Sequence, residues 1–299
     1  MSVVKDNSIK VSSKEKIDGD VDFNVGNIDA QGCLTIGGSV QPGFKVKSGG
    51  DLKIEGSIMS AQVDCEANCV IEGGITGKGS QVITGGDADI KFIEQSTLKA
   101  DGLIVIRSQS YFSHVASKSD IRCNPSSIVM GGSLVAAGNL SLGTVGSETS
   151  DPATIGAGID PERLEQYRQL QQSLTDQENE LIQWIQLHGN AQSRKVRKME
   201  SEIEETRTQL YTFNLIPGTE LFSRSGFGTS REEIDELNPL YHAGLNIDTI
   251  IIELAGTAYG GTTVMIGNRS LILEKEVSKR QFKLSRDMKR IIALPLRSK

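Results

Sequence analysis

Aromatic residues and long apolar runs are both scarce in this chain. Phe, Tyr and Trp together make up 5% of its 299 residues, and there is a single Trp. This composition favours a core of stacked small aliphatic side chains over the cavity-rich core of an enzyme. No run approaches the roughly 20 apolar residues that a membrane helix needs, so we expect no integral membrane segment.

Cysteine is rare as well, and the net charge is negative. The four cysteines, at positions 33, 65, 69 and 123, are fewer than in small secreted domains held by disulfides. Residues 1–6 lack the apolar stretch of a secretion signal. We therefore expect buried, reduced thiols in a cytoplasmic protein. Because a net charge of −6 gives no bulk attraction to nucleic acid, we expect no nucleic-acid partner.

A repeat with a spacing of 16–19 residues dominates the first half of the chain. In each copy a short motif of Gly-Asp or Gly-Asn precedes an apolar residue, a spacer and a second apolar residue. The apolar pairs are Leu34/Ile36, Leu52/Ile54, Cys69/Ile71, Ala88/Ile90, Ile104/Ile106, Ile121/Cys123 and Leu140/Leu142. Such periods are typical of solenoids, in which each repeat buries its apolar face against its neighbours.

Each repeat offers about three short strands. Between positions 50 and 66, apolar stretches at 52–54, 58 and 63–65 are separated by Gly, Ser, Asn or Asp corners. This pattern predicts a mainly β protein built as a right-handed parallel β-helix, since a left-handed helix of hexapeptides keeps a stricter period. An Asp/Asn ladder at the corners predicts side-chain bonds to local backbone rather than an ion site. Its members are Asp51, Asn68, Asp87, Asp120 and Asn139.

The composition changes after Gly146, and we predict four segments. Residues 1–146 form the β-helix, 147–160 a linker, 161–245 a helical hairpin insertion and 246–299 a return β segment that completes or caps the β-helix. Asp160 followed by Pro161 and Glu162 is a strong helix start.

Two helical stretches flank Gly189-Asn190, and the second has the 3–4 apolar spacing of a coiled coil. We therefore expect an antiparallel coiled-coil hairpin. The apolar stripes are Leu164, Tyr167, Leu174, Leu181 and Ile185 in the first helix, and Val196, Met199, Ile203, Thr206, Leu210 and Phe213 in the second.

Several strings, in this order along the chain, resemble the flagellar assembly protein A family of bacteria. They are DGDVDFNVGNID at 18–29, PGFKVK at 42–47, GGDLKI at 49–54, GGITGKG at 73–79, KFIE at 91–94, GIDP at 158–161, GTAYGG at 256–261 and IGN at 266–268. The resemblance covers about 16–216 and 245–296, as in a short form without the N-terminal domain of longer members. It implies a β-helix carrying a helical hairpin, no established catalytic residues, and a role in flagellar assembly or its placement in the cell.

Two carboxylates on neighbouring repeats, Glu55 and Glu72, have the arrangement of the paired acids of a glycosidase. The same position continues into Lys91 and Arg107, however. That continuation favours a charged face in which opposite signs meet across the repeats.

Other candidates for chemistry favour structural roles. The loop at 73–79 has the wrong glycine spacing for a phosphate-binding loop, and Gly79 rather than Ser or Thr follows Lys78. Cys65 and Cys69 should both point inward. The histidines at 114, 188 and 242 are scattered, whereas zinc needs four convergent ligands. We therefore assign no catalytic, cofactor-binding or metal-binding residue.

The expected hairpin carries the candidate partner contacts. Arg194, Lys195, Arg197 and Lys198 cluster at its predicted tip, where they form either a solvated face or a docking site for an acidic partner. Trp184 lies beside the apolar stripe, and its role is either packing in the seam or contact with a partner, because tryptophan is enriched at interface hot spots.

The C-terminal stretch is basic, with eight Lys or Arg and one acid between positions 279 and 299. One interpretation is a helix on a membrane surface, with Leu284, Met288 and Ile291 on one face. The resemblance instead places 282–284 and 291–293 in closing strands, which we favour.

The function that we expect is a non-enzymatic scaffold or adaptor that holds out a coiled-coil arm to protein partners, with a homo-oligomer through the hairpin as one form. A cytoskeletal protein that polymerises by stacking of β-helix ends is the alternative, although the return segment argues against it. A carbohydrate-active β-helix enzyme is disfavoured, because the chain shows no export signal or carboxylate ladder.

Overall fold

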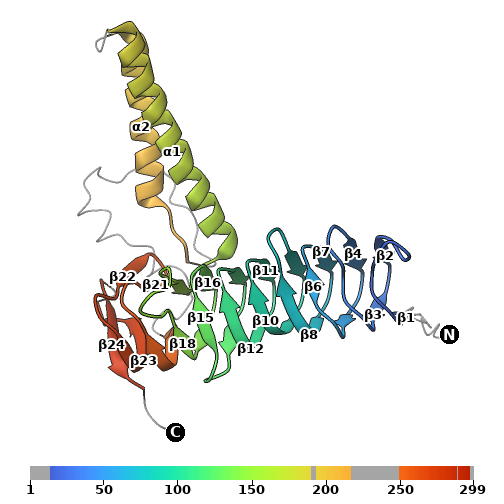
Figure 1. Ribbon diagram of the computed structural model, residues 1–299. Helices are drawn as coiled ribbons and strands as arrows, with labels where there is room; N and C mark the ends of the chain where they lie inside the picture. The colour runs from blue at the N-terminus through green and yellow to red at the C-terminus, as the bar shows by residue number, and fades with distance from the viewer. Residues whose placement is uncertain (1–13, 190–192, 217–248, 288, 297–299) are drawn as a thin grey trace, which may run out of the picture.

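A computed structural model describes residues 14–189, 193–216, 249–287 and 289–296 of the chain. Its main body is a rod-shaped β-solenoid, from which two long helices project near one end (Figure 1). Parallel ladders along the rod form two sheets. The predicted β-solenoid and the two helices are therefore confirmed.

The first sheet takes the first and second strand positions of each turn. Its parallel members are β1 (Lys14–Ile17), β3 (Cys33–Ile36), β5 (Leu52–Ile54), β6 (Ile58–Met59), β8 (Cys69–Thr76), β10 (Ala88–Glu94), β12 (Ile104–Tyr111), β14 (Ile121–Cys123), β15 (Ile128–Met130), β17 (Leu140–Leu142), β18 (Thr144–Val145) and β20 (Ile252–Ala258). Strands β8 and β12 span both positions, since each pairs with two strands of a neighbouring turn.

The second sheet takes the third position and lies across the core from the first. Its members are β2 (Ile28–Ala30), β4 (Lys45–Ser48), β7 (Gln62–Cys65), β9 (Gln81–Thr84), β11 (Thr97–Ala100), β13 (His114–Ser117), β16 (Ser133–Ala136), β19 (Thr154–Ala157), β21 (Thr263–Ile266) and β22 (Arg269–Ile272). All neighbours pair in parallel except β21 and β22.

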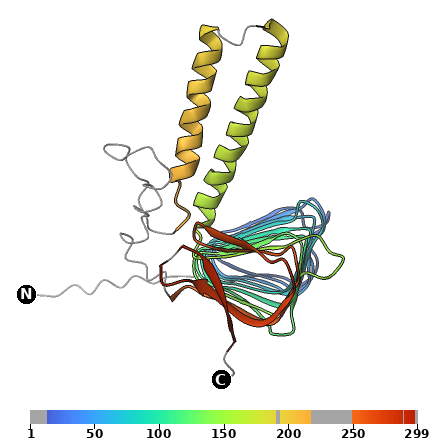
Figure 2. The same cartoon turned by 90° about the vertical axis from the view of Figure 1, so that its left-hand side faces the viewer.

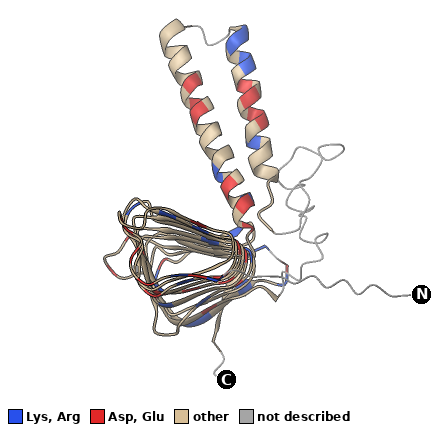
Figure 3. Cartoon of the chain, turned by 90° about the vertical axis from the view of Figure 1, so that its right-hand side faces the viewer, with Lys and Arg blue, Asp and Glu red and all other residues tan. Residues whose placement is uncertain are grey.

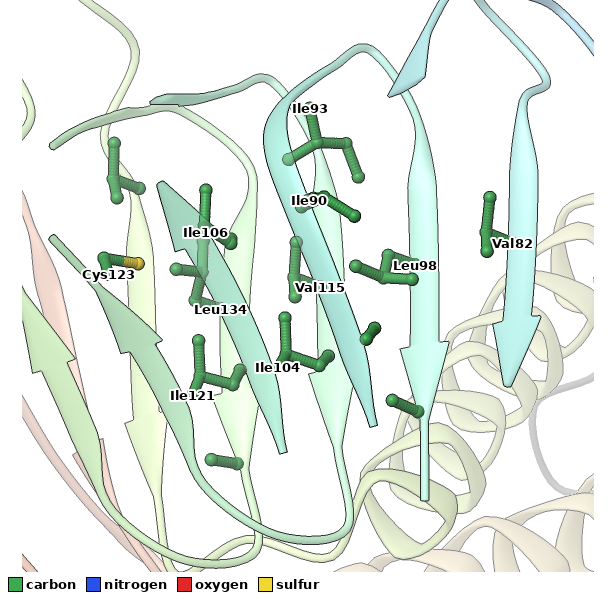
Figure 4. Packing of buried hydrophobic residues seen from close by; sticks show 14 of the residues in the cluster. Val82, Ile90, Ile93, Leu98, Ile104, Ile106, Val115, Ile121, Cys123 and Leu134 are labelled. Carbon is green, nitrogen blue, oxygen red and sulfur yellow. The ribbon is translucent and has the colours of Figure 1, made fainter. Parts of the chain in front are cut away.

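The register of the ladders follows the apolar pairs of the repeat. Leu52 pairs with Cys69 and Ile54 with Ile71, so that like positions stack from turn to turn. Residues of the pairs are buried while the spacer between them faces outward, because successive side chains of a strand point to opposite faces. Figure 4 shows the interior rows, with Ile90, Ile104 and Ile121 from the first sheet and Leu98, Val115 and Leu134 from the second.

The corner ladder has the predicted structural role. The side chain of Asp51 accepts the backbone N–H of Asn68 at 3.1 Å, and that of Asn68 accepts the N–H of Asp87 at 2.9 Å. The same bond joins Asp120 to Asn139 at 2.8 Å. Each side chain thus satisfies a backbone donor on the next turn.

Two helices interrupt the solenoid and return the chain to it. They are α1 (Pro161–His188) and α2 (Arg194–Thr212), which lie side by side as a hairpin (Figure 2). Strand β20 then takes the place that follows β17, with Leu140 opposite Ile252. The part of the predicted insertion at 217–245 and His242 lie outside the described residues.

The prediction of a linker over 147–160 is wrong. This segment contains β19, which pairs with β16 on one side and β21 on the other. Its side chains at Ala153, Ile155, Ala157 and Ile159 are buried. The first three occupy the same inward positions as the corresponding residues of earlier turns, whereas Ile159 packs with Val135 in a separate cluster. The solenoid therefore continues up to the start of α1.

The return segment ends in antiparallel strands. Strand β23 (Val277–Leu284) pairs with β20, and β24 (Ile291–Pro295) pairs with β23. The preferred interpretation of the basic tail as closing strands is thereby confirmed for residues 282–284 and 291–293. The described residues between 279 and 296 form no helix. These strands cover the β20 edge of the solenoid, where another parallel turn would otherwise add.

Candidate functional site: the helical hairpin

Local sequence determines where the helices of the hairpin begin and end. The carboxylate of Asp160 accepts the backbone N–H groups of Glu162 and Arg163 at 2.9 and 3.3 Å, as predicted for a capping residue. Helix α1 ends at Gly189, whose φ of 64° lies in the left-handed region that favours glycine. The hydroxyl of Ser193 caps α2 by accepting the N–H of Val196 at 3.2 Å.

The base of the hairpin, residues 160–167 and 210–216, packs on the solenoid. Leu164, Phe213 and Leu215 form a buried cluster with Val135 and Ile159 of the rod. The ring of Tyr167 packs against this cluster, with its centroid 5.9 Å from that of Phe213. The hairpin therefore has a hydrophobic footing of its own, separate from the main core.

Polar contacts hold the same base. The amide of Asn268 donates to the carbonyl of Phe213 at 2.7 Å and accepts the N–H of Leu215 at 2.9 Å. The N–H of Asp160 donates to the carbonyl of Leu215 at 2.7 Å, so the two ends of the hairpin leave the rod together.

An ion pair adds a further tie between rod and helix. The ammonium of Lys118, on the rod, lies 2.7 Å from the carboxylate of Glu162 and 3.0 Å from that of Asp101. Hydrogen bonds to these two carboxylates raise the pKa of Lys118. Because its side chain is 43% exposed, solvent screens the pair and its contribution is small.

Along the seam between α1 and α2, more residues of α2 than of α1 are fully buried. Val196, Ile203 and Thr206 are buried, and the predicted stripe residues Met199 and Leu210 are half-buried. The guanidinium of Arg207 bridges to the carboxylate of Glu178 on α1 at 2.6 Å. This contact links the two helices, but solvent screens it because its side chains are 54% and 40% exposed, so its contribution is small.

The single tryptophan lies at the far end of the hairpin. Its ring stacks on that of His188, with centroids 4.4 Å apart and planes at 9°. The ammonium of Lys195 lies 5.7 Å from the centroid of the Trp184 ring, within the range of a cation–π contact. Through Lys195, Trp184 of α1 contacts α2. Because Trp184 is half-buried, part of its side chain remains in contact with solvent.

A groove, here called the tip groove, runs between the helices beside this contact. Its lining residues are Gln177 and Glu180 from α1 and Lys195, Lys198, Met199 and Glu202 from α2. Figure 3 shows basic residues at the start of α2 and acidic ones further toward the base. Two of the four predicted basic contacts thus meet in the groove, while Arg194 and Arg197 are exposed outside it.

Glu180 and Glu202 are groove residues that were not predicted from the sequence. Glu202 stands four residues after Lys198, and the spacing places both on one face of α2 with an ion pair of 3.4 Å. That signal was available in the sequence. Glu180 reaches the groove only through the packing of α1 on α2, for which the sequence carries no local signal.

The outward carboxylates on the rod form a charged face, as predicted. Lys53 lies 3.8 Å from Glu55 and 3.9 Å from Glu72. The guanidinium of Arg107 binds Glu72 at 3.1 Å and Asp89 at 2.7 Å, and these contacts raise the pKa of Arg107. Each contact between turns pairs opposite signs, which supports stacking of the turns.

All four cysteines are unpaired thiols, and all but Cys33 are buried. The thiol of Cys65 donates toward backbone carbonyls such as that of Gly50 at 3.2 Å. A hydrogen bond with Cys69 lowers the pKa of Cys65. Burial raises the pKa of Cys123 to about 12.

The remaining candidates have local partners. His114 shares a hydrogen bond of 2.9 Å with the hydroxyl of Ser133. Gly74 lies in β8 beneath the ring of Phe92, where a Cβ would clash with that ring, so this glycine serves packing. Among the residues described, no group of three or more His, Cys, Asp or Glu is arranged to hold a metal ion.

Neither α1 nor α2 combines the length and apolar character required to cross a bilayer, within the part of the chain that is described.

Comparison with known proteins identifies the family of the chain. No curated protein and no solved structure matches it. The family model for the flagellar assembly protein A β-solenoid domain matches residues 14–289, which include the rod, both helices and the first of the two closing strands, β23. The chain therefore belongs to the flagellar assembly protein A β-solenoid family.

Proposed function

We propose that this protein is a non-enzymatic cytoplasmic scaffold that holds out its helical hairpin to protein partners during flagellar assembly. The family match supports a role related to flagellar assembly, and the family is not a known family of enzymes. The hairpin is the part of the molecule on which the scaffold role rests.

One observation carries the proposal: the hairpin is anchored at its base and exposed at its tip. The base has a buried cluster around Phe213 and paired hydrogen bonds from Asn268. Toward the tip, Ile182 is 52% exposed and Leu187 is 81% exposed. An arm fixed at one end, with apolar and charged side chains at the other, is suited to contact another protein.

The candidate contacts are Trp184, Arg194, Lys195, Arg197 and Lys198. Tryptophan and arginine are enriched among the residues that dominate binding energy at protein interfaces. Trp184 and Lys195 lie together, so a partner seated on one would contact the other.

The experiment compares partners captured from bacterial cells by the intact chain and by a chain with a shortened hairpin. Excision of residues 179–204, with a Gly-Asn-Gly turn in their place, removes the tip and keeps both the base and the Glu178–Arg207 pair. We expect the shortened chain to fold with an unchanged rod and to lose partners and swimming motility. Retention of every interaction and of motility by the folded, shortened chain would contradict the proposal.

A further inference from the structure

The tip groove has a charge pattern that is complementary to itself. Lys195 and Lys198 lie on its tip side, and Glu180 and Glu202 lie on its base side. Met199 stands between the two kinds of charge, one residue after Lys198 and three before Glu202. Residue numbers rise toward the tip in α1 and toward the base in α2. Glu180, which precedes Trp184, and Glu202, which follows Met199, therefore both lie on the base side. A half-turn about Met199 exchanges the basic side for the acidic side.

The charges of the groove are accessible and incompletely paired. Within the described part of the chain, neither Glu180 nor Lys195 forms an ion pair. The one ion pair in the groove, between Lys198 and Glu202, has side chains that are 78% and 52% exposed. These side chains are therefore free to reorient toward a partner.

Apolar residues in the same half of the hairpin are also incompletely buried. Trp184, Ile185 and Met199 are half-buried, while Leu187 is largely exposed. A pair of helices buries one face of each, whereas a four-helix bundle encloses a core. Figure 2 shows that the tip halves of α1 and α2 project beyond the solenoid, where a second hairpin has room to lie against them.

We propose that the tip groove binds the tip groove of a second copy of this chain, with the two hairpins antiparallel about a two-fold axis at Met199. Lys195 and Lys198 of each copy then face Glu180 and Glu202 of the other. A two-fold interface uses the same patch on both subunits and requires that patch to be self-complementary. The inference rests on the proposed function of the hairpin and names a second copy as its partner.

This arrangement places the two rods on opposite sides of the axis. Met199 lies thirteen residues from the last residue of α2 (Thr212), or roughly 20 Å at 1.5 Å per residue, so the hairpin bases are roughly 40 Å apart. The hairpin pair then acts as a spacer between two parallel-sheet rods.

The test reverses the charges on each side of the groove in the full-length chain. Lys195→Glu with Lys198→Glu makes the groove wholly acidic, and Glu180→Lys with Glu202→Lys makes it wholly basic. We expect wild type to sediment as a dimer, each variant alone as a monomer, and an equimolar mixture of the two variants as a dimer. The matched control is Glu200→Lys with Glu204→Lys, which changes the charge as much as the reversal of Glu180 and Glu202 does, at exposed positions of α2 outside the groove, and should leave the dimer intact.

A covalent probe tests the position of the axis. In a Cys33→Ser background, Met199→Cys should give a disulfide-linked dimer under mild oxidation by a small disulfide, since residues on a two-fold axis meet their own copies. Ser201→Cys, exposed on another side of α2, should give little. Unchanged helical circular dichroism in all variants would show that any loss of the dimer does not result from unfolding. The Lys195→Glu change is compatible with α2, because acidic residues in the first turn of a helix are favourable.

A monomeric wild type, a dimer unaffected by either reversal, or a mixture that remains monomeric would each overturn the second-copy inference. If wild type is monomeric while removal of residues 179–204 still costs the chain a cellular partner, only this inference fails and the proposed function stands. If the shortened chain loses no partner and no motility, the proposed function fails as well.

Discussion

Asn139 and Ile251 are 112 residues apart in the sequence and neighbours in the solenoid. The N–H of Ile251 donates to the side-chain oxygen of Asn139 at 2.9 Å. This is the same bond that joins Asp120 to Asn139 one turn earlier, at 2.8 Å. The corner ladder therefore continues across the helical insertion, and it sets the level at which the chain re-enters the rod.

We expect Asn139→Ala to lower the free energy of unfolding by about 1–3 kcal/mol, because it leaves the part-buried N–H of Ile251 without its acceptor. Urea denaturation of the full chain measures this difference. Asn139→Asp is the matched control, since it retains an acceptor oxygen in nearly the same volume. An equal loss in both variants would show that the hydrogen bond is not the cause.

We expect Phe213→Ala to cost about 3–5 kcal/mol, the range for removal of a large buried aromatic side chain. Phe213 is 7% exposed and lies in the cluster that fixes the hairpin to the rod. Protection from hydrogen exchange in the first turns of α1 should fall with it. Leu187→Ala, at a position that is 81% exposed, should stay within about 0.5 kcal/mol of wild type. A similar loss of stability in Phe213→Ala and Leu187→Ala would show that Phe213 does not anchor the hairpin to the rod.

The Cys123 thiol should make stability fall at alkaline pH. Burial raises its pKa from about 9 to about 12, so the folded state keeps the proton over a range in which the unfolded state releases it. Its contribution is complete below pH 9 and is lost as the pH rises toward 12, by about 1.4 kcal/mol per pH unit. The free energy of unfolding, measured from pH 8 to 11, should fall less steeply for Cys123→Ala than for wild type. Equal slopes for wild type and Cys123→Ala would contradict the expectation.

The register of the rod is predictable from the sequence because strand alternation is local. Each pair such as Leu52 and Ile54 marks its own inward positions, and the stacking of like positions follows. Strand β19 escaped prediction because Thr154-Ile155-Gly156-Ala157 is short and rich in small residues. Its strand character depends on β16 and β21, and β21 lies more than 100 residues further along.

The hairpin is predictable as far as its caps and stripes, since capping and periodicity are local as well. Asp160 marked its start and Gly189 its turn. The tip groove was not predictable, because the position of Glu180 on the same groove as Lys195 depends on how α1 is rotated against α2.

The hydrogen bond between Asp160 and Leu215 has a consequence for how the molecule can vary. Since both ends of the hairpin leave the rod at one place, whole heptads can be inserted into or removed from the two helices without displacing a single turn of the solenoid. Each added heptad in both helices extends the arm by roughly 10 Å. Mutation can therefore change how far the helical arm extends without changing the stability of the rod.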